Sequence, residues 1–440
     1  MKVDNKRGSL LKRPGGENTE GDDFRFAEEL LNVSPEEARE EFDRLYTSAR
    51  QSRNPADQAR AALGIARAAS LSDKIDVAIR HGREAAQLYQ MLGDHAGEGR
   101  AAVEIGVIHL RHGQLSQALM EFERGLRLCE QADNPRGIAN SHGNLGLVHY
   151  ELHSFDIALH HYVQAARIFA ETNSAYPLSS TYSNIALLFM DVRQYDSALR
   201  YIDKAIDILP KDSDPDDRSR LIGNRGAILL ELGELDEAMA AFQEALKYIR
   251  VVGNVYIEGR MNENIGEVYV KRKDYSVALE SYRTYLSLVR KMENGKNAEA
   301  EALHSLAATL RLAGQVEEAE QALREAWRIW AGLDSDSGQA KACYALASLF
   351  EDQQKLEQAE EFVRSAKVFV STSLHPQLSA DICLMLTRFA ERRNDFERAY
   401  REYREHHDAL KGMQKRRQRS IESLLKMQLA LNPLIEDQRS

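Results

Sequence analysis

The sequence predicts an all-α protein, an α-solenoid of about nine helix-turn-helix units followed by an extended C-terminal helix. Three observations support this fold class. Only nine of the 440 residues are proline, and the abundant Ala, Leu, Glu and Arg lose little rotamer freedom in helices. One alanine recurs at a fixed interval along most of the chain. Around it, small and large apolar residues alternate at helical spacing.

The repeat is defined by nine alanines, here called the marker alanines. They are Ala78, Ala118, Ala158, Ala198, Ala238, Ala278, Ala319, Ala359 and Ala399. The step between them is constant, except that the step from Ala278 to Ala319 is longer by one position. A fixed period of this length is the sequence signature of a solenoid.

Two further columns keep step with the marker alanines. Twelve positions earlier the sequence has a small residue, namely Ala66, Gly106, Gly146, Ala186, Gly226, Gly266, Ala307 and Ala347. Four positions later it has a large apolar one, namely Phe122, Tyr162, Ile202, Phe242, Tyr282, Leu323, Val363 and Tyr403. Small residues let two helices approach to about 8 Å, and large ones fill the space where the helices diverge. With turns at Gly113, Gly233 and Gly314, each unit is predicted to be an antiparallel pair of a first and a second helix.

These columns resemble the tetratricopeptide repeat (TPR) family from about Ala61 to His406. One matching unit contains Asn144, Leu145, Gly146, Tyr150, Ala158, Tyr162 and Ala165. The usual period in that family is about 34 residues. Here the six extra residues are expected after the second helix, as in 211–217 and 292–297, which resembles the long-repeat branch that includes kinesin light chains and bacterial signalling sensors. The resemblance implies a right-handed superhelix whose first helices line a concave binding surface.

The ends of the chain depart from the repeat. Residues 1–23 are predicted to be a disordered tail, because they are rich in Gly, Lys and Asp. Residues 24–60 are predicted to form a partial capping unit, with Ser34 as N-cap and Pro35 at the first helical position. The TPR array is assigned to 61–411, and a C-terminal extension helix to 412–440.

The candidate binding surface lies on the first helices. Four positions, counted as eighteen, fourteen, eleven and seven before the marker alanine, share one helix face, which is not the packing face. The second of these positions is Asn144, Asn184, Asn224 and Asn264 in four successive units. Asparagine is a mediocre helix former, so helix propensity does not explain the column.

A carboxamide can donate to a carbonyl and accept from an N–H, so a column of them can hold an extended peptide backbone. The column resembles the asparagine ladder of long-repeat TPR proteins. The alternative is that these amides bond within or between repeats and only orient the stack. Another column, with Arg100, Arg220, Arg260 and Lys341, indicates acidic residues in the ligand.

No metal or cofactor is expected. Seven histidines fall in two neighbouring units: His109, His112, His142, His149, His153, His160 and His161. His109 and His149 share a column one repeat apart, and helices about 8–10 Å apart hold equivalent side chains too far from each other for metal ligands at about 2 Å. We expect these histidines to pack. Cys129, Cys343 and Cys383 are too few and too distant for a disulfide framework.

The chain is expected to end in a long helix from Phe396 to Asn432, stopped by Pro433. A stripe of Ile421, Leu424, Leu425, Gln428 and Leu431 could pack on the last repeat or pair with a second chain as a homodimer. This ending resembles the exit helix of bacterial sensors that hand a signal to a cyclase or kinase domain.

Composition excludes several functional classes. A net charge of −10 argues against a nucleic-acid partner held by phosphate neutralisation. No stretch of about 18 apolar residues and no secretory signal is present, so we expect a cytoplasmic protein without membrane insertion. No phosphate-binding loop, nucleophile elbow or paired metal ligands occur, so we expect no enzyme activity.

Three functions remain open. The first is a scaffold, adaptor or regulator that binds an extended, acidic peptide segment or another protein in the concave groove. The second is the sensor module of a signalling system, which passes ligand binding through the C-terminal helix to a partner output domain of cyclase or kinase type. The third is an intracellular receptor for a signalling peptide.

Overall fold

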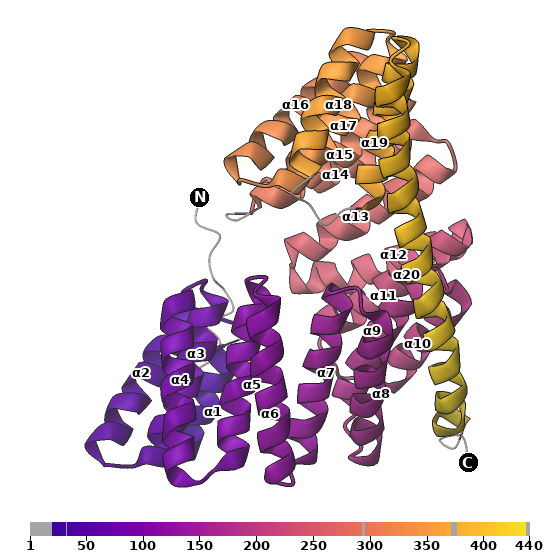
Figure 1. Ribbon diagram of the computed structural model, residues 1–440. Helices are drawn as coiled ribbons and strands as arrows, with labels where there is room; N and C mark the ends of the chain where they lie inside the picture. Colours follow the sequence, from indigo (N-terminus) through magenta and orange to yellow (C-terminus); the bar gives the residue numbers. More distant parts are fainter. Residues whose placement is uncertain (1–19, 32, 293–294, 371–375, 437–440) are drawn as a thin grey trace. The chain divides into compact units, whose positions relative to one another are not determined.

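The computed structural model describes residues 20–31, 33–292, 295–370 and 376–436 (Figure 1). In these ranges every regular element is an α-helix and no strand occurs, which confirms the all-α solenoid. The chain divides into two compact units. The first comprises the described residues up to Leu188 and those from Leu424 onward, and the second is Phe189–Ser423.

The helices follow one another at a nearly constant spacing. From the N-terminus they are α1 (Glu20–Leu30), α2 (Pro35–Gln51), α3 (Pro55–Leu71), α4 (Ile75–Leu92), α5 (His95–Arg111), α6 (Leu115–Gln131), α7 (Pro135–Glu151), α8 (Phe155–Glu171), α9 (Ala175–Asp191) and α10 (Tyr195–Ile208). The chain continues with α11 (Pro215–Leu232), α12 (Leu235–Val252), α13 (Val255–Lys271), α14 (Tyr275–Val289), α15 (Lys296–Leu312), α16 (Val316–Gly332), α17 (Asp336–Asp352), α18 (Leu356–Val370), α19 (Pro376–Arg392) and α20 (Phe396–Glu436). From α3 onward, odd-numbered helices are the first helices and even-numbered ones the second.

The marker alanines lie in the core of the stack. All nine are buried, and eight of them have no exposed surface. The small residues of the first helices explain why. A Cβ at Gly106 would lie 2.6 Å from the Phe122 ring, and the same distance separates Gly146 from Tyr162. The small column therefore sits directly beneath the large column, as the sequence predicts.

Side-chain capping fixes the start of six first helices, α3, α5, α7, α11, α13 and α17. The side chains of Asn54, Asp94, Asn134, Asp214, Asn254 and Ser335 accept a hydrogen bond from a backbone N–H two or three residues later. Such bonds satisfy N–H groups that have no partner inside the helix. Most second helices lack this bond; Asp274, before α14, is an exception. In these repeats the N-terminal end of the first helix is therefore fixed by the same kind of hydrogen bond.

The turns within the units use a left-handed residue whether or not it is glycine. Gly113, Gly233 and Gly314 have the predicted positive φ. The equivalent residues of the other six units also have positive φ, namely Asp73, His153, Arg193, Lys273, Gln354 and Asn394. Such a conformation costs a non-glycine residue free energy, so packing of the two helices must impose it.

Longer connections after the second helix occur near the two places named in the prediction, but the structure corrects the expected position of the extra residues in the other repeats. In most units the second helix continues to within three residues of the next first helix, for example from α6 to α7. The extra residues therefore lengthen helices, because continued helix buries more apolar surface than a loop. A longer connection occurs between α10 and α11, and between α14 and α15, where the one longer step between marker alanines falls.

Both ends of the chain differ in detail from the prediction. Helix α1 begins at Glu20, inside the segment predicted to be disordered, because Phe24 and Ala27 are buried in a cluster with α2 and α3. Residues 1–19 lie outside the described part. Ser34 precedes α2 as N-cap, with Pro35 at its first position.

Helix α20 runs to Glu436, so the prediction that Pro433 ends it is wrong. Proline removes one backbone N–H donor and crowds the carbonyl four residues earlier. Since Pro433 stands in the last turn of the helix, few bonds remain to be disrupted beyond it.

Two glycines of α7 provide a test of this packing. Gly146→Ala should destabilise the protein by about 1–3 kcal/mol, because its Cβ would collide with Tyr162 and also lie 3.2 Å from the Ala158 carbonyl oxygen. Gly143→Ala should stabilise it by about 0.5–1 kcal/mol, since nothing lies within 4 Å of its added Cβ. Urea denaturation followed by circular dichroism measures both. Equal effects of the two changes would contradict the proposed packing.

Candidate functional site

Within each of the two compact units, the first helices of successive repeats form a continuous inner surface. Helix α5 contacts both α3 and α7, and α13 contacts both α11 and α15. In the part of the chain described, successive second helices do not contact each other to a comparable extent. The stack therefore curves locally toward its first helices, and the face predicted to bind lies on that side.

The four asparagines occupy equivalent places on four first helices. Asn144 lies on α7, Asn184 on α9, Asn224 on α11 and Asn264 on α13. All four are partly buried. Among the described residues, the side chains of Asn144, Asn184 and Asn264 make no hydrogen bond, whereas Asn224 has a partner. Three amides on the inner face thus keep their hydrogen-bonding groups unused within the protein.

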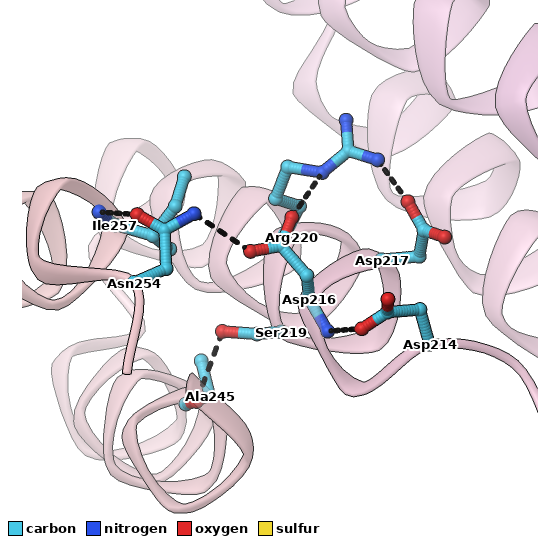
Figure 2. A network of polar contacts seen from close by, with 8 residues as sticks. All are labelled: Asp214, Asp216, Asp217, Ser219, Arg220, Ala245, Asn254 and Ile257. Atoms are coloured by element: carbon cyan, nitrogen blue, oxygen red, sulfur yellow. Dashed lines mark hydrogen bonds and ion pairs between the residues drawn. The ribbon is translucent and has the colours of Figure 1, made fainter. Parts of the chain in front are cut away.

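Arg220 stands at the N-terminal end of α11, beside the asparagine column. Figure 2 shows its guanidinium paired with Asp217 and with Asp216, the latter at 3.4 Å. Asp216 also accepts a hydrogen bond of 2.9 Å from the Asn254 amide, the N-cap of the next first helix. The arginine is therefore anchored in a small acidic network.

The other three predicted cations are also paired. Arg260 bonds to Glu263 at 2.6 Å, Lys341 to Glu301 at 3.1 Å, and Arg100 lies 4.0 Å from Asp94. These pairs are exposed enough that each contributes about 0–1 kcal/mol. A carboxylate of a ligand could replace the internal partner at small cost.

Carboxylates also crowd the same face around α13, beside the cations that the sequence predicts there. Glu263 accepts from Arg260 and from the Ser305 hydroxyl, the latter at 3.1 Å. The pKa of Glu267 is raised, chiefly by burial and further by Glu231 and Glu263. The second unit therefore offers acceptors as well as cations.

A histidine cluster joins α7 and α8 in the first unit. The Nδ1 atoms of His142 and His161 lie 2.9 Å apart, and the ring of His149 stacks on His161 with centroids 5.6 Å apart. The sequence prediction considered His149 together with His109, the equivalent residue of the preceding repeat. In the structure the ring of His149 instead contacts His161 of its own repeat. The ring of His149 lies nearly parallel to that of His161, at an interplanar angle of 9°.

All three cysteines are free and buried. Burial raises the pKa of Cys343 to about 11 and that of Cys383 to about 11. Cys383, Glu402 and Glu405 lie close together as metal ligands would. The ammonium of Lys367 bonds to both carboxylates, at 2.5 and 2.8 Å, so an internal cation already neutralises this group.

The stacked helix pairs define a helical-repeat protein. The chain belongs to the tetratricopeptide repeat family. Sequence models of this family match residues 97–171, 177–250, 258–332 and 340–367. A comparison with curated proteins found no match. No described helix is both long enough and apolar enough to cross a membrane.

Several solved structures share the fold. The apo form of the quorum sensor NprR from B. thuringiensis has a TM-score of 0.61 at 13% identity, covering 79% of this chain and 97% of NprR. The apo form of RapI has 0.57 at 15%, covering 80% and 98%. The Rap conjugation gene regulator of plasmid pLS20 in complex with the Phr* peptide has 0.51 at 16%, covering 79% and 97%. Identities this low establish the fold alone.

The histidine cluster predicts an acid-sensitive repeat. The pKa of His161 is lowered to about 4, first by burial and then by His142, His149 and His160. An unfolded imidazole has a pKa near 6.5. Since the folded pKa is the lower one, this contribution to stability is complete above about pH 6.5 and is lost as the pH falls toward 4.

The expected result is a melting temperature that drops between pH 7 and pH 4.5, and drops less in His161→Gln. The exposed His95 provides the control, because His95→Gln should leave the pH profile unchanged. Glu123 and Asp156 face His149 and favour its charged form, so the same measurement on Asp156→Asn should show a steeper drop. Identical profiles for all four proteins would count against the cluster.

Proposed function

We propose that the protein is a binding scaffold or receptor that holds extended peptide segments on the first-helix faces of its repeats. Asn144 and Asn184 would grip the backbone in the first unit, and Asn224 and Asn264 in the second. The observation that carries this proposal is the recurrence of a partly buried asparagine on successive first helices, with an unused amide in three of the four. An amide whose only role was to orient the repeats would form a hydrogen bond with a neighbouring group of the stack.

The spacing of the amides suits an extended ligand. Packed helices lie about 8–10 Å apart, and an extended chain advances about 3.3 Å per residue. Neighbouring asparagines would therefore meet the peptide backbone about every third residue. Each amide can donate to one carbonyl and accept from one N–H, which fixes the backbone without reading its side chains.

Specificity would come from the charged groups beside the column. Arg100, Arg220, Arg260 and Lys341 can exchange their internal partners for acidic residues of the ligand. Glu267 lies one turn from Asn264; burial raises its pKa, and a cationic group of the ligand would stabilise its charged form. A segment carrying both charge signs fits the second unit best.

The likeness to peptide-related structures supports this reading. NprR is described as a quorum sensor, and the similar Rap regulator was solved with a bound peptide. These proteins share the fold with the present chain, and its own partner has to be found by experiment. Crosslinking in native cells followed by mass spectrometry would identify it.

The asparagine column can be tested with fluorescent peptides selected from a displayed library of ten-residue sequences. Asn224→Ala with Asn264→Ala should weaken binding about 30–100-fold in fluorescence anisotropy, because each lost backbone clamp costs about 1–1.4 kcal/mol. Gln243→Ala, on the exposed side of the second helix α12, is the matched control and should bind normally. Unchanged affinity in the double variant, with an unchanged melting temperature, would reject the groove.

The cations make a separate prediction. Arg220→Gln and Arg260→Gln should each weaken binding of selected acidic peptides about 3–10-fold at low salt, and the difference should shrink as salt rises. Arg283→Gln, a paired cation on the second helix α14, should change affinity less than twofold. If all three substitutions have equal effects, the ligand is not read by these arginines.

A second function is favoured by the length of α20. This helix has 41 residues, against 17 in α19, its partner in the last repeat. A helix that continues so far beyond its repeat is suited to passing a change in the array to an output domain of a signalling partner. Deleting residues 412–440 should then leave peptide affinity intact and abolish association with that partner.

A further inference from the structure

Three repeats stack two rings between their paired helices, and in one of them both rings are imidazoles. The rings stand nine positions before the marker alanine and three positions after it. The pairs are Phe189 with Tyr201, Phe350 with Phe362, and His149 with His161, with ring centroids 5.4, 5.5 and 5.6 Å apart. Phenyl and phenol rings thus serve the packing at these positions, and ring nitrogens are not required by it.

A third imidazole joins the same repeat where the next repeat has a phenol ring. His142, sixteen positions before the marker alanine, is the equivalent of Tyr182. His142 belongs to α7 and His161 to α8, which pack against each other. Both side chains are partly buried. The ring of the exposed His160 has its centroid 5.6 Å from that of His161, so the pair lies close to the surface.

The nitrogens of His142 and His161 are placed as two ligands of one metal ion would be. Their Nδ1 atoms lie 2.9 Å apart. With metal–nitrogen distances of about 2.0–2.1 Å, that separation corresponds to an angle of about 90° at the ion. Neighbouring ligands of a square-planar or octahedral ion make this angle, whereas a tetrahedral ion would hold the two nitrogens about 3.3 Å apart.

We propose that His142 and His161 form a binding site for a divalent transition-metal ion that prefers such an angle, namely Cu²⁺ or Ni²⁺. This replaces the sequence-based expectation that the histidines only pack. That expectation compared histidines one repeat apart, whereas this pair joins the first and second helices of a single repeat. The site is independent of the proposed peptide-binding face, because both side chains lie between α7 and α8.

The charges around the pair suit a cation. Burial, and then the neighbouring histidines, lower the pKa of His161 to about 4, and burial also lowers the pKa of His142. Both rings are therefore neutral at pH 7, the form that binds metal. Glu123 and Asp156 act on the adjacent His149 in the direction that favours positive charge. These two carboxylates would reduce the cost of holding an ion there.

Binding requires a change of tautomer. In the metal-free pair one Nδ1 donates its hydrogen to the other, at 2.9 Å. When the ion binds, that hydrogen moves to Nε2 of the same ring, so that both Nδ1 lone pairs face the ion and no net proton is released. Among the described residues, no third Cys, His, Asp or Glu ligand atom gathers with this pair. Water therefore completes the coordination.

Calorimetric titration of the untagged, chelator-treated full chain with CuSO₄ at pH 7 tests the site. His142→Tyr and His161→Tyr each remove one ligand but keep a ring, as the next repeat does. We expect one Cu²⁺ per wild-type chain and an affinity lower by about 100-fold or more in either variant, since even loss of an outer-shell partner costs about 10–100-fold. His149→Phe, which copies the next repeat at a position outside the pair, is the matched control and should change affinity less than threefold.

Electron paramagnetic resonance of the Cu²⁺-loaded protein gives a second readout, and circular dichroism of the metal-free variants checks that they fold. The wild type and His149→Phe should show nitrogen couplings from two imidazoles, and each tyrosine variant from one at most. Three results would overturn the proposal: no Cu²⁺ bound by the wild type, the same spectrum and affinity in His142→Tyr and His161→Tyr as in the wild type, or an equal loss of affinity in a folded His149→Phe.

Discussion

In most repeats the structure depends on the contact between a small residue of the first helix and the large side chain that the second helix lays over it. At Gly106 and Gly146 there is no room for even one added carbon. This closeness brings the two backbones together, buries the marker alanine and sets the angle of each pair. The angle then determines where the next pair can dock, so the curvature of the first-helix face follows from one repeated contact.

The same constraint leaves the inner face free to vary. Packing uses the positions that face the second helices, and the asparagine column lies elsewhere on the helix. A polar residue there costs little in packing, which allows Asn, Ser and Glu to exchange between repeats. Charged neighbours differ from one repeat to the next for the same reason. The inner face can therefore carry recognition while the core stays uniform.

Periodicity made the fold predictable, because nine copies of one column average out local exceptions. Single-copy features were not predictable in this way. The pairing of His142 with His161 depends on the rotation of α7 against α8, which no column reports. Positive φ at Lys273 or Arg193 is imposed by two packed helices, and neither residue type signals it. The asparagine column was visible in the sequence, but that three of its amides lack internal partners required coordinates.

The one longer step between marker alanines shows how such an array tolerates change in length. One residue inserted within a helix would rotate everything after it by about 100° and turn the buried columns outward. The extra residue of this chain falls instead in the connection between α14 and α15, where no helical phase is carried forward. Duplication of a whole repeat also preserves the phase. The array can therefore change in length by whole repeats or by residues added in these connections. Its length would then change in discrete steps during evolution.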